Sequence, residues 1–208
     1  MNGAFERLTA GAPATTLVLA AFALVSLLGL YGRPQLIERH LLRPHGMAQR
    51  GDWWTLATCG FIHADIAHLA FNAFTFWSFG PGVERALGTP LYLLLYALGL
   101  LGSSGVTWWL HRRQPGYASL GASGAILAVL FASIVLYPQA SLMMFPLPVP
   151  IPAPLFAVIY LVFSMVASRS RVGRINHDAH IAGAVIGLLF VVVAVPGALS
   201  RAVGHFFG

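Results

Sequence analysis

The chain has 208 residues, of which 58% are hydrophobic and only 9% are charged. Soluble domains usually carry about 25% charged residues, so too few polar side chains remain here to cover a surface that faces water. The net charge of +6 comes from arginines spread over loops between apolar segments, which favours membrane lipids over nucleic acid as the partner. A single cysteine excludes an intrachain disulfide.

Six apolar segments approach the length of roughly 20 residues that a membrane helix needs. Their cores are residues 15–31, 66–79, 90–110, 120–137, 154–167 and 179–195. The first segment lacks a small-residue cleavage site and is expected to stay as a membrane helix. The sequence therefore predicts an all-α, polytopic membrane protein. A six-helix bundle is expected over residues 15–197, with short tails at 1–14 and 198–208.

The connections between these segments differ in character. Residues 32–60 form a long loop with four arginines and the pair Trp53-Trp54, which suits a membrane interface. A tight turn is expected over 80–89. Residues 138–152 contain FPLPVPIP, which is too rich in proline for a continuous helix.

Polar residues gather at the starts of the second, fourth and sixth segments. These three segments must run in the same direction, so their first residues share one side of the membrane. His68 and Asn72 lie early in the second, Ser123 opens the fourth and His180 opens the sixth. Ionisable groups inside membrane helices are expensive and usually functional, so we expect the three groups to form one site.

The fourth segment carries the pattern Gly121-x-Ser123-Gly124. The glycines let a substrate approach the serine closely, and a helix start offers unpaired backbone N–H groups to an anion. The pattern favours Ser123 as a nucleophile. Helix packing stays open as an alternative, because small residues and serine are also common where membrane helices meet.

The sixth segment places His180, Gly183 and Gly187 on one helix face. His180 is therefore the candidate general base, with a purely structural hydrogen bond as its alternative role. His177 is the competing base and is expected in a solvated loop. Asp178 lies two residues before His180, and such residues do not face each other on a helix. A Ser–His dyad is thus the simpler prediction.

The second segment places His68 and Asn72 four residues apart, on one face. Both can donate hydrogen bonds, as an oxyanion stabiliser requires. His63 is expected to be a hydrogen-bonded loop anchor. A zinc site built from His63, His68 and His180 lacks a carboxylate or a second H-x-x-x-H pair, so neither a metal nor another cofactor is expected.

Four motifs together resemble the rhomboid family of intramembrane serine proteases. FIHADIAHLAFN resembles the family's first histidine element, with His63, His68, Leu69 and Asn72 in place. GPGVERALG resembles the turn that follows and supplies Glu84. GASG resembles the nucleophile motif, and AHIAG followed by Gly187 resembles the final one.

The resemblance implies a helical bundle that cleaves peptide bonds in or near membrane helices of other proteins. It implies that Ser123 attacks, that His180 transfers the proton, and that His68, Asn72 and the Ser123 N–H bind the oxyanion. A multi-pass location in a bacterial-type inner membrane is expected. Two positions depart from the family: Thr55 stands where an arginine often follows tryptophan, and Leu127 where an aromatic residue often stacks on the histidine.

The resemblance also places both termini in the cytoplasm. Three arginines then lie inside and nine outside, the reverse of the positive-inside rule. We follow the resemblance, because four of the nine lie in the long first loop. A catalytically inactive relative that binds membrane clients is the first alternative, although such proteins typically lack the serine or histidine. A small channel or transporter is the second, although no internal repeat is visible.

Overall fold

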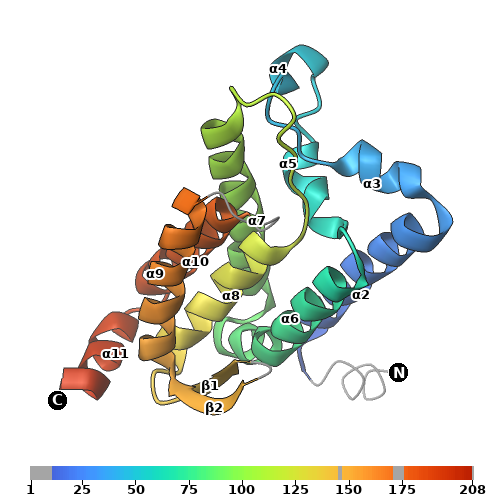
Figure 1. Ribbon diagram of the computed structural model, residues 1–208. Coiled ribbons are helices and arrows are strands. Elements are labelled where there is room, and N and C mark those ends of the chain that lie inside the picture. The colour runs from blue at the N-terminus through green and yellow to red at the C-terminus, as the bar shows by residue number, and fades with distance from the viewer. Residues whose placement is uncertain (1–10, 145–146, 171–175, 208) are drawn as a thin grey trace, which may run out of the picture.

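The computed structural model describes residues 11–144, 147–170 and 176–207, and helices dominate them (Figure 1). In chain order the helical elements are α2 (Pro13–Leu27), η1 (Leu28–Gly32), α3 (Pro34–His40), α4 (Met47–Arg50), α5 (Thr55–Thr58), η2 (Cys59–Phe61), α6 (Ile66–Leu87), α7 (Thr89–His111), α8 (Ser123–Leu136), α9 (Ala153–Ser170), α10 (His177–Ala194) and α11 (Ala198–Phe207). Two strands, β1 (Ser141–Met144) and β2 (Leu147–Pro152), form an antiparallel hairpin between α8 and α9.

Each of the six predicted apolar segments falls on a helix, namely α2, α6, α7, α8, α9 and α10. Within the described residues, three helical stretches are long and apolar enough to cross a membrane: Pro13–Gly32, Thr89–His111 and His177–Ala194. The apolar helices Ser123–Leu136 and Ala153–Ser168 are shorter. A mostly helical bundle with several candidate spans is thus confirmed, whereas the number of six spans stays a prediction.

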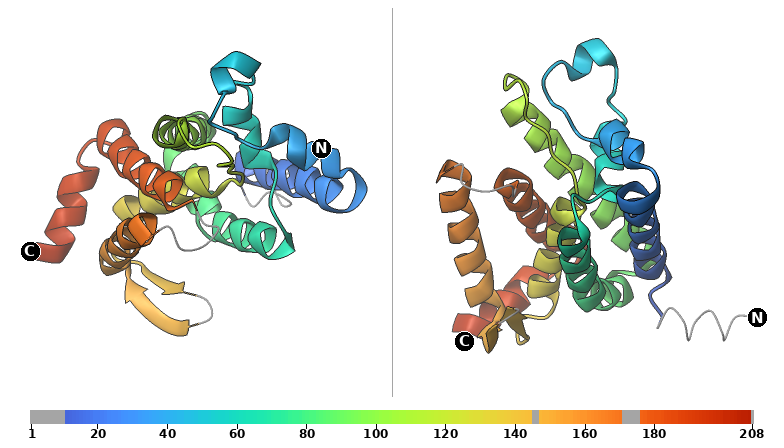
Figure 2. Two further views of the ribbon diagram at one scale, coloured as in Figure 1. Left: turned by 45° about the horizontal axis from the view of Figure 1, so that its top comes forward. Right: turned by 45° about the vertical axis from the view of Figure 1, so that its right-hand side comes forward.

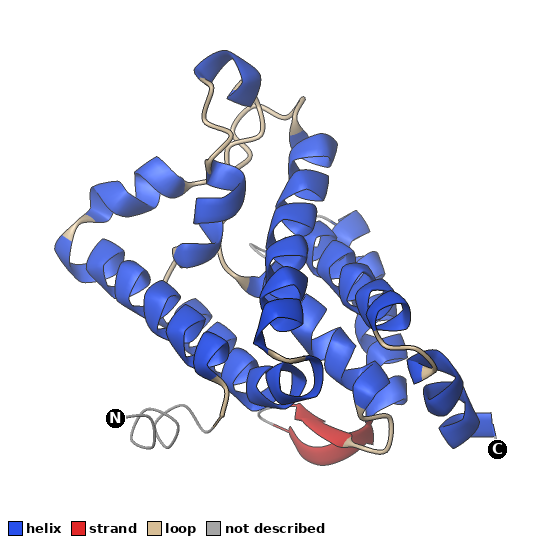
Figure 3. Ribbon diagram, turned by 180° about the vertical axis from the view of Figure 1, so that it is seen from behind, coloured by secondary structure: helices blue, strands red, loops and turns tan. Residues whose placement is uncertain are grey.

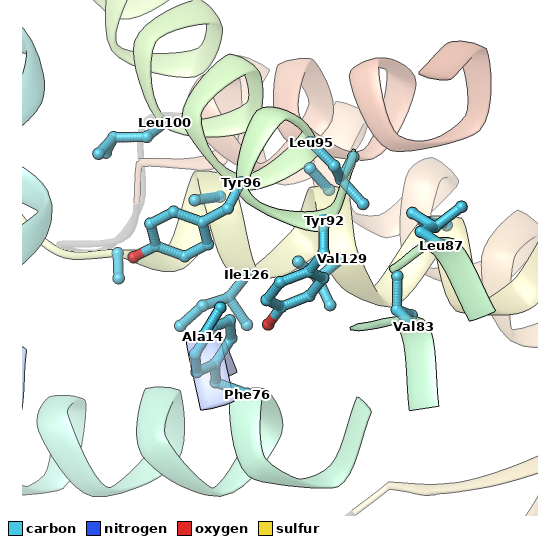
Figure 4. Packing of buried hydrophobic residues seen from close by; sticks show 14 of the residues in the cluster. Ala14, Phe76, Val83, Leu87, Tyr92, Leu95, Tyr96, Leu100, Ile126 and Val129 are labelled. Atoms are coloured by element: carbon cyan, nitrogen blue, oxygen red, sulfur yellow. The ribbon is translucent and has the colours of Figure 1, made fainter. Parts of the chain in front are cut away.

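Helix α8 lies in the middle of the bundle (Figures 1 and 2). All its residues from 124 to 135 are buried, and α6, α7 and α10 pack around it. A helix that is apolar on every side is expected in such a position. Figure 4 shows part of this core, where Tyr92 and Leu95 of α7 lie near Ile126 and Val129 of α8. The residue that opens α8 is therefore fixed by a tightly packed element.

Helix α6 is longer than predicted and replaces the turn expected over 80–89. It continues through Pro81 to Leu87 and ends where Gly88 adopts a φ of 75°. Its last turns are held by Glu84, whose carboxylate accepts hydrogen bonds from the backbone N–H groups of Ala14 and Thr15 at 2.9 and 2.8 Å.

Two hydroxyl groups complete the surroundings of Glu84. The Thr15 and Thr89 hydroxyls each donate to its carboxylate at 2.8 Å. The Thr15 hydroxyl is also 2.9 Å from the Tyr92 hydroxyl. We call Glu84, Thr15, Thr89 and Tyr92 the Glu84 cluster. It ties the end of α6 to the beginnings of α2 and α7.

The predicted all-α fold is wrong between α8 and α9, where the chain forms the β1–β2 hairpin (Figure 3). Its register pairs Ser141 with Pro152 and Leu142 with Ile151. Alternating prolines cannot continue a helix, but an edge strand tolerates them where no N–H is needed. The Ala153 N–H donates to the Ala140 carbonyl at 3.0 Å, on the side of β1. Successive residues of a strand point their backbone nitrogens to opposite edges. The nitrogens of Pro152 and Pro150 therefore face away from β1, toward the open edge of β2.

The long first loop contains the short helices α3, α4 and α5. Thr55, the first departure from the family pattern, is buried and donates its hydroxyl to the Asp52 carbonyl at 2.7 Å. Leu42 exchanges two backbone hydrogen bonds of 3.0 Å with Ser119. The loop is thereby joined to the segment that leads into α8. At the other end of the chain, residues 198–207 form helix α11.

Candidate active site

Ser123 and His180 are in hydrogen-bonding contact. The Ser123 Oγ lies 2.8 Å from the His180 Nε2. Ser123 is the first residue of α8, and His180 lies in the first turn of α10. Two side chains that are 57 positions apart in sequence thus meet because the starts of two neighbouring helices meet. This is the geometry in which a histidine can take a proton from a serine hydroxyl.

The contact between α8 and α10 is made by backbone atoms. Gly183 packs directly on the Gly124 carbonyl, and Gly187 packs on the Ala128 carbonyl. A Cβ atom at either glycine would overlap these atoms. Both partners advance by four residues from one contact to the next, so the helices run parallel and in register. The predicted supporting glycines therefore lie at the interface that brings the serine and histidine together.

Asn176 is a further residue that holds the two helix starts, and the sequence analysis missed it. It caps α10, because its Oδ1 accepts from the Ala179 N–H at 3.1 Å. Its Nδ2 donates to the hydroxyls of Thr107 and Ser119, each at 2.9 Å. The signal in the sequence is an asparagine directly before an apolar helix, which is a common N-cap.

His68 and Asn72 come from α6 and approach the segment before Ser123. Gly121 has a φ of 108°, a conformation that side chains with a Cβ rarely adopt. A Cβ there would lie 2.7 Å from the His68 Cε1 and 3.7 Å from the Asn72 Nδ2. Gly121 is thus required both by the backbone conformation and by the closeness of the two side chains.

The Asn72 amide is buried and has no hydrogen-bond acceptor within the part of the chain that the structure describes. Asn72 is 4% exposed, and its Nδ2 has no partner among the described residues. A buried donor without a partner is costly, and such groups call for an explanation. Asn72 lines the same cavity as Ser123, where its amide can donate to a bound group.

His63 lies behind the site rather than in it. Its buried Nδ1 is 2.8 Å from the Ser26 hydroxyl of α2, and its ring meets the His68 ring edge-on at 4.9 Å between centroids. This arrangement suits the loop anchor that the sequence favoured. His63 also limits the positions that the His68 ring can adopt.

His177 and Asp178 differ in what they contact. His177 is the first residue of α10 and is buried, which contradicts its expected position in a solvated loop. Its ring packs edge-on against Phe163 and His180. Asp178 points elsewhere: its carboxylate accepts from the Ser168 hydroxyl and lies 3.0 Å from the His111 Nε2. Asp178 therefore joins α10 to α7 and α9, and neither of these two contacts involves His180.

The aromatic ring beside His180 comes from another helix than the one that carries Leu127. Leu127 is buried and, as an aliphatic residue, supplies no ring to stack on the histidine. Instead Tyr160 of α9 lies beside His180, with ring centroids 6.4 Å apart and planes inclined by 26°. Its hydroxyl is 2.9 Å from the His180 Nδ1. Sequence reasoning missed Tyr160, because a tyrosine in an apolar helix shows no sign of its partner.

A cavity of about 750 Å³ opens in front of the dyad. Its polar lining includes Ser123, His180, His68 and Asn72. Tyr160 and the segment before α8 also line it. The apolar part of its wall comes mainly from α6, α8, α9 and the hairpin: Phe71, Phe74, Phe79, Ile126, Leu127, Leu130, Leu142, Met143 and Phe156. A few polar groups at one place in an apolar cavity are typical of a binding site. Among the described residues, no three His, Cys, Asp or Glu side chains are grouped as a metal ion would need.

Comparison with known proteins agrees with the motifs. Residues 50–197 match the rhomboid domain family. The chain is 33% identical to the rhomboid protease GluP of Bacillus subtilis over 153 residues, which are 73% of this chain and 28% of that protein. It is 28% identical to the rhomboid protease AarA of Providencia stuartii over 158 residues, 68% of this chain and 56% of that protein.

A further relative is the putative rhomboid protease YdcA of Bacillus subtilis, 40% identical over 81 residues that make up 38% of this chain and 39% of that protein. The chain spans less than two thirds of the length of each of these relatives. The family match covers well over half of the chain and includes every residue of the Ser123–His180 site. The chain therefore belongs to the rhomboid family.

Proposed function

We propose that this protein is an intramembrane serine endopeptidase that works with a dyad of Ser123 and His180. The observation that carries the proposal is the 2.8 Å contact between the Ser123 Oγ and the His180 Nε2. The two helices that deliver these atoms are held by direct backbone contact at Gly183 and Gly187. The chemical groups and their rigid support therefore come together in one place, as preorganised catalysis requires.

In the proposed reaction the Ser123 Oγ attacks the carbonyl carbon of a peptide bond while its proton passes to the His180 Nε2. The carbonyl oxygen becomes an oxyanion, which accepts hydrogen bonds from Asn72, His68 and the Ser123 N–H. The tetrahedral intermediate collapses, and His180 returns the proton to the leaving amine. A water molecule, deprotonated by the same histidine, then hydrolyses the acyl-enzyme and frees Ser123.

The proposed substrates are membrane proteins cut in or near a membrane helix. The support is the mostly apolar wall of the 750 Å³ cavity, which suits a peptide segment that arrives from lipid. With this activity we propose a six-span topology, cytoplasmic termini and a bacterial-type inner membrane. A catalytically inactive client-binding relative is less well supported, because Ser123 and His180 are both present at bonding distance.

The test uses the purified protein in detergent, a fluorophosphonate probe and a membrane-anchored reporter. The wild type should label and cleave, whereas Ser123→Ala should do neither, and His180→Ala should lose cleavage. Ser133→Ala is the matched control, because Ser133 also lies in α8 but donates its hydroxyl within its own helix, to the Leu130 carbonyl. Near-normal turnover by Ser123→Ala would refute the serine-protease mechanism.

A further inference from the structure

The His180 ring is held at both of its nitrogens. Nε2 faces Ser123 at 2.8 Å, and Nδ1 faces the Tyr160 hydroxyl at 2.9 Å. Tyr160 lies in the middle of α9, on the side turned to the bundle. The ring inclination of 26° leaves the tyrosine roughly parallel to the imidazole. Tyr160 therefore restricts both the rotation of the His180 ring and the position of its Nδ1.

The proposed reaction of the dyad determines which group donates in the hydrogen bond between His180 and Tyr160. For His180 to take the Ser123 proton, Nε2 must be unprotonated. In a neutral imidazole the proton is then on Nδ1, and Nδ1 must donate to the Tyr160 oxygen. The opposite arrangement, in which Tyr160 donates to Nδ1, would leave the proton on Nε2 and block the transfer. Only one tautomer of His180 is competent, and an acceptor at Nδ1 favours it.

A phenol is well suited to this place. A carboxylate would be the stronger acceptor, but an ionised group in a membrane interior is costly. The carboxylate nearest in sequence, Asp178, contacts Ser168 and His111 instead. A tyrosine hydroxyl is neutral and can accept the Nδ1 proton, while its ring fills the apolar space beside His180.

We propose that Tyr160 is the positioning residue of the dyad: its hydroxyl accepts a hydrogen bond from the His180 Nδ1 and holds the tautomer that can deprotonate Ser123. The proposal rests on the proposed Ser–His mechanism. It also makes α9 a part of the catalytic unit. The outward face of α9 consists of exposed apolar side chains such as Leu155, Val158 and Phe163, so this bond is a polar tie between a peripheral helix and His180.

The central experiment compares Tyr160→Phe with the wild type in cleavage of the membrane-anchored reporter. The change keeps the ring and removes the acceptor. A neutral hydrogen bond of this kind predicts a loss in kcat of about 3- to 10-fold, with KM within about twofold. Tyr137→Phe is the matched control, because Tyr137 bonds the Gly82 carbonyl at 3.0 Å, away from the dyad. This control should keep wild-type kcat.

A second measurement separates positioning from a merely structural role. In protein labelled with ¹⁵N-histidine, with the His180 signal assigned by its loss in His180→Ala, the wild type should show the proton on Nδ1. Tyr160→Phe should shift part of this population to Nε2, while its Tm in detergent stays within about two degrees.

The outcomes are distinct. Unchanged kcat and an unchanged tautomer in Tyr160→Phe would overturn the role of Tyr160 while leaving the dyad intact. A rise in KM alone, or a fall in Tm that matches the loss of activity, would also overturn it by assigning Tyr160 to substrate contact or to folding. If the wild type neither labels at Ser123 nor cleaves, the proposed function itself fails and the inference fails with it.

Discussion

The buried polar groups at the two ends of helix α6 differ in how far their hydrogen bonds are satisfied by the described residues. At its C-terminal end Glu84 is buried, and four donors satisfy its carboxylate. At its N-terminal end Asn72 is also buried, but its amide N–H groups have no acceptor within the described chain and lie beside a cavity. A satisfied buried network stabilises a fold, whereas an unsatisfied donor costs stability until a ligand arrives. The first end therefore holds the bundle together, and the second, in the proposed mechanism, keeps a donor for the oxyanion.

The largest effect is expected from a change that touches neither end of α6. Gly183→Val should abolish cleavage and clearly lower the Tm. The added side chain would overlap the Gly124 carbonyl, so α10 would have to move away from α8. Reporter cleavage and thermal unfolding in detergent measure both. Gly105→Val in α7 is the matched control, since a Cβ there meets nothing within 4 Å. Equal effects of the two changes would show that the α8–α10 contact is not what supports the dyad.

Glu84→Ala should destabilise the protein at the C-terminal end of α6. It leaves two backbone N–H groups and two hydroxyls without their acceptor, and the unfolding free energy should fall by about 3 kcal/mol or more. Denaturant unfolding in detergent measures this loss. Glu38→Ala is the control, because Glu38 is an exposed residue that pairs with Arg43 on the surface. If both variants lose the same small amount, the hydrogen bonds of Glu84 contribute little.

Asn72→Ala, near the N-terminal end of α6, should lower activity without lowering stability. We expect kcat to fall by about 10- to 100-fold, because one oxyanion donor is lost while the Ser123 N–H remains. The unfolding free energy should stay constant or rise slightly, since an unsatisfied donor disappears. His68→Ala should behave similarly in kcat, and the double variant should be much worse than either. An effect on KM alone, or a fall in stability that accompanies the loss of rate, would assign these residues to binding or folding.

His177→Ala should have the smallest effect, within about twofold in kcat. The His180 Nε2 already faces Ser123 at 2.8 Å, and His177 contributes an edge-on ring contact instead. Steady-state cleavage measured beside His180→Ala checks the assignment. An inactive His177→Ala together with an active His180→Ala would transfer the role of base to His177.

The sequence predicted those parts that depend on local pattern. Apolar runs indicated the helices, and polar residues at the starts of three parallel segments indicated that Ser123, His180, His68 and Asn72 would meet. The extension of α6 beyond Pro81 was missed, because it depends on Glu84 reaching the start of α2, about 70 residues earlier in sequence. Long-range polar contacts leave no periodicity in a sequence.

The hairpin and Tyr160 escaped prediction for related reasons. The prolines of residues 147–152 excluded a helix, but the sequence did not show that β1 would supply a partner strand. The partner of Tyr160 is His180, on the next helix, and the family pattern directed attention to Leu127 instead. The structure places a ring beside His180 from a different helix, a substitution visible only in three dimensions.

The open edge of β2 has a consequence for how the protein meets other chains. Pro150 and Pro152 have no N–H, so an extended peptide laid along this edge would find carbonyl oxygens but none of the donors that a regular ladder supplies there. The cavity in front of the dyad lies at the same hairpin, since Leu142 and Met143 of β1 line it. The prolines therefore disfavour the addition of a third strand at this edge, whether from a peptide or from a second copy of the protein.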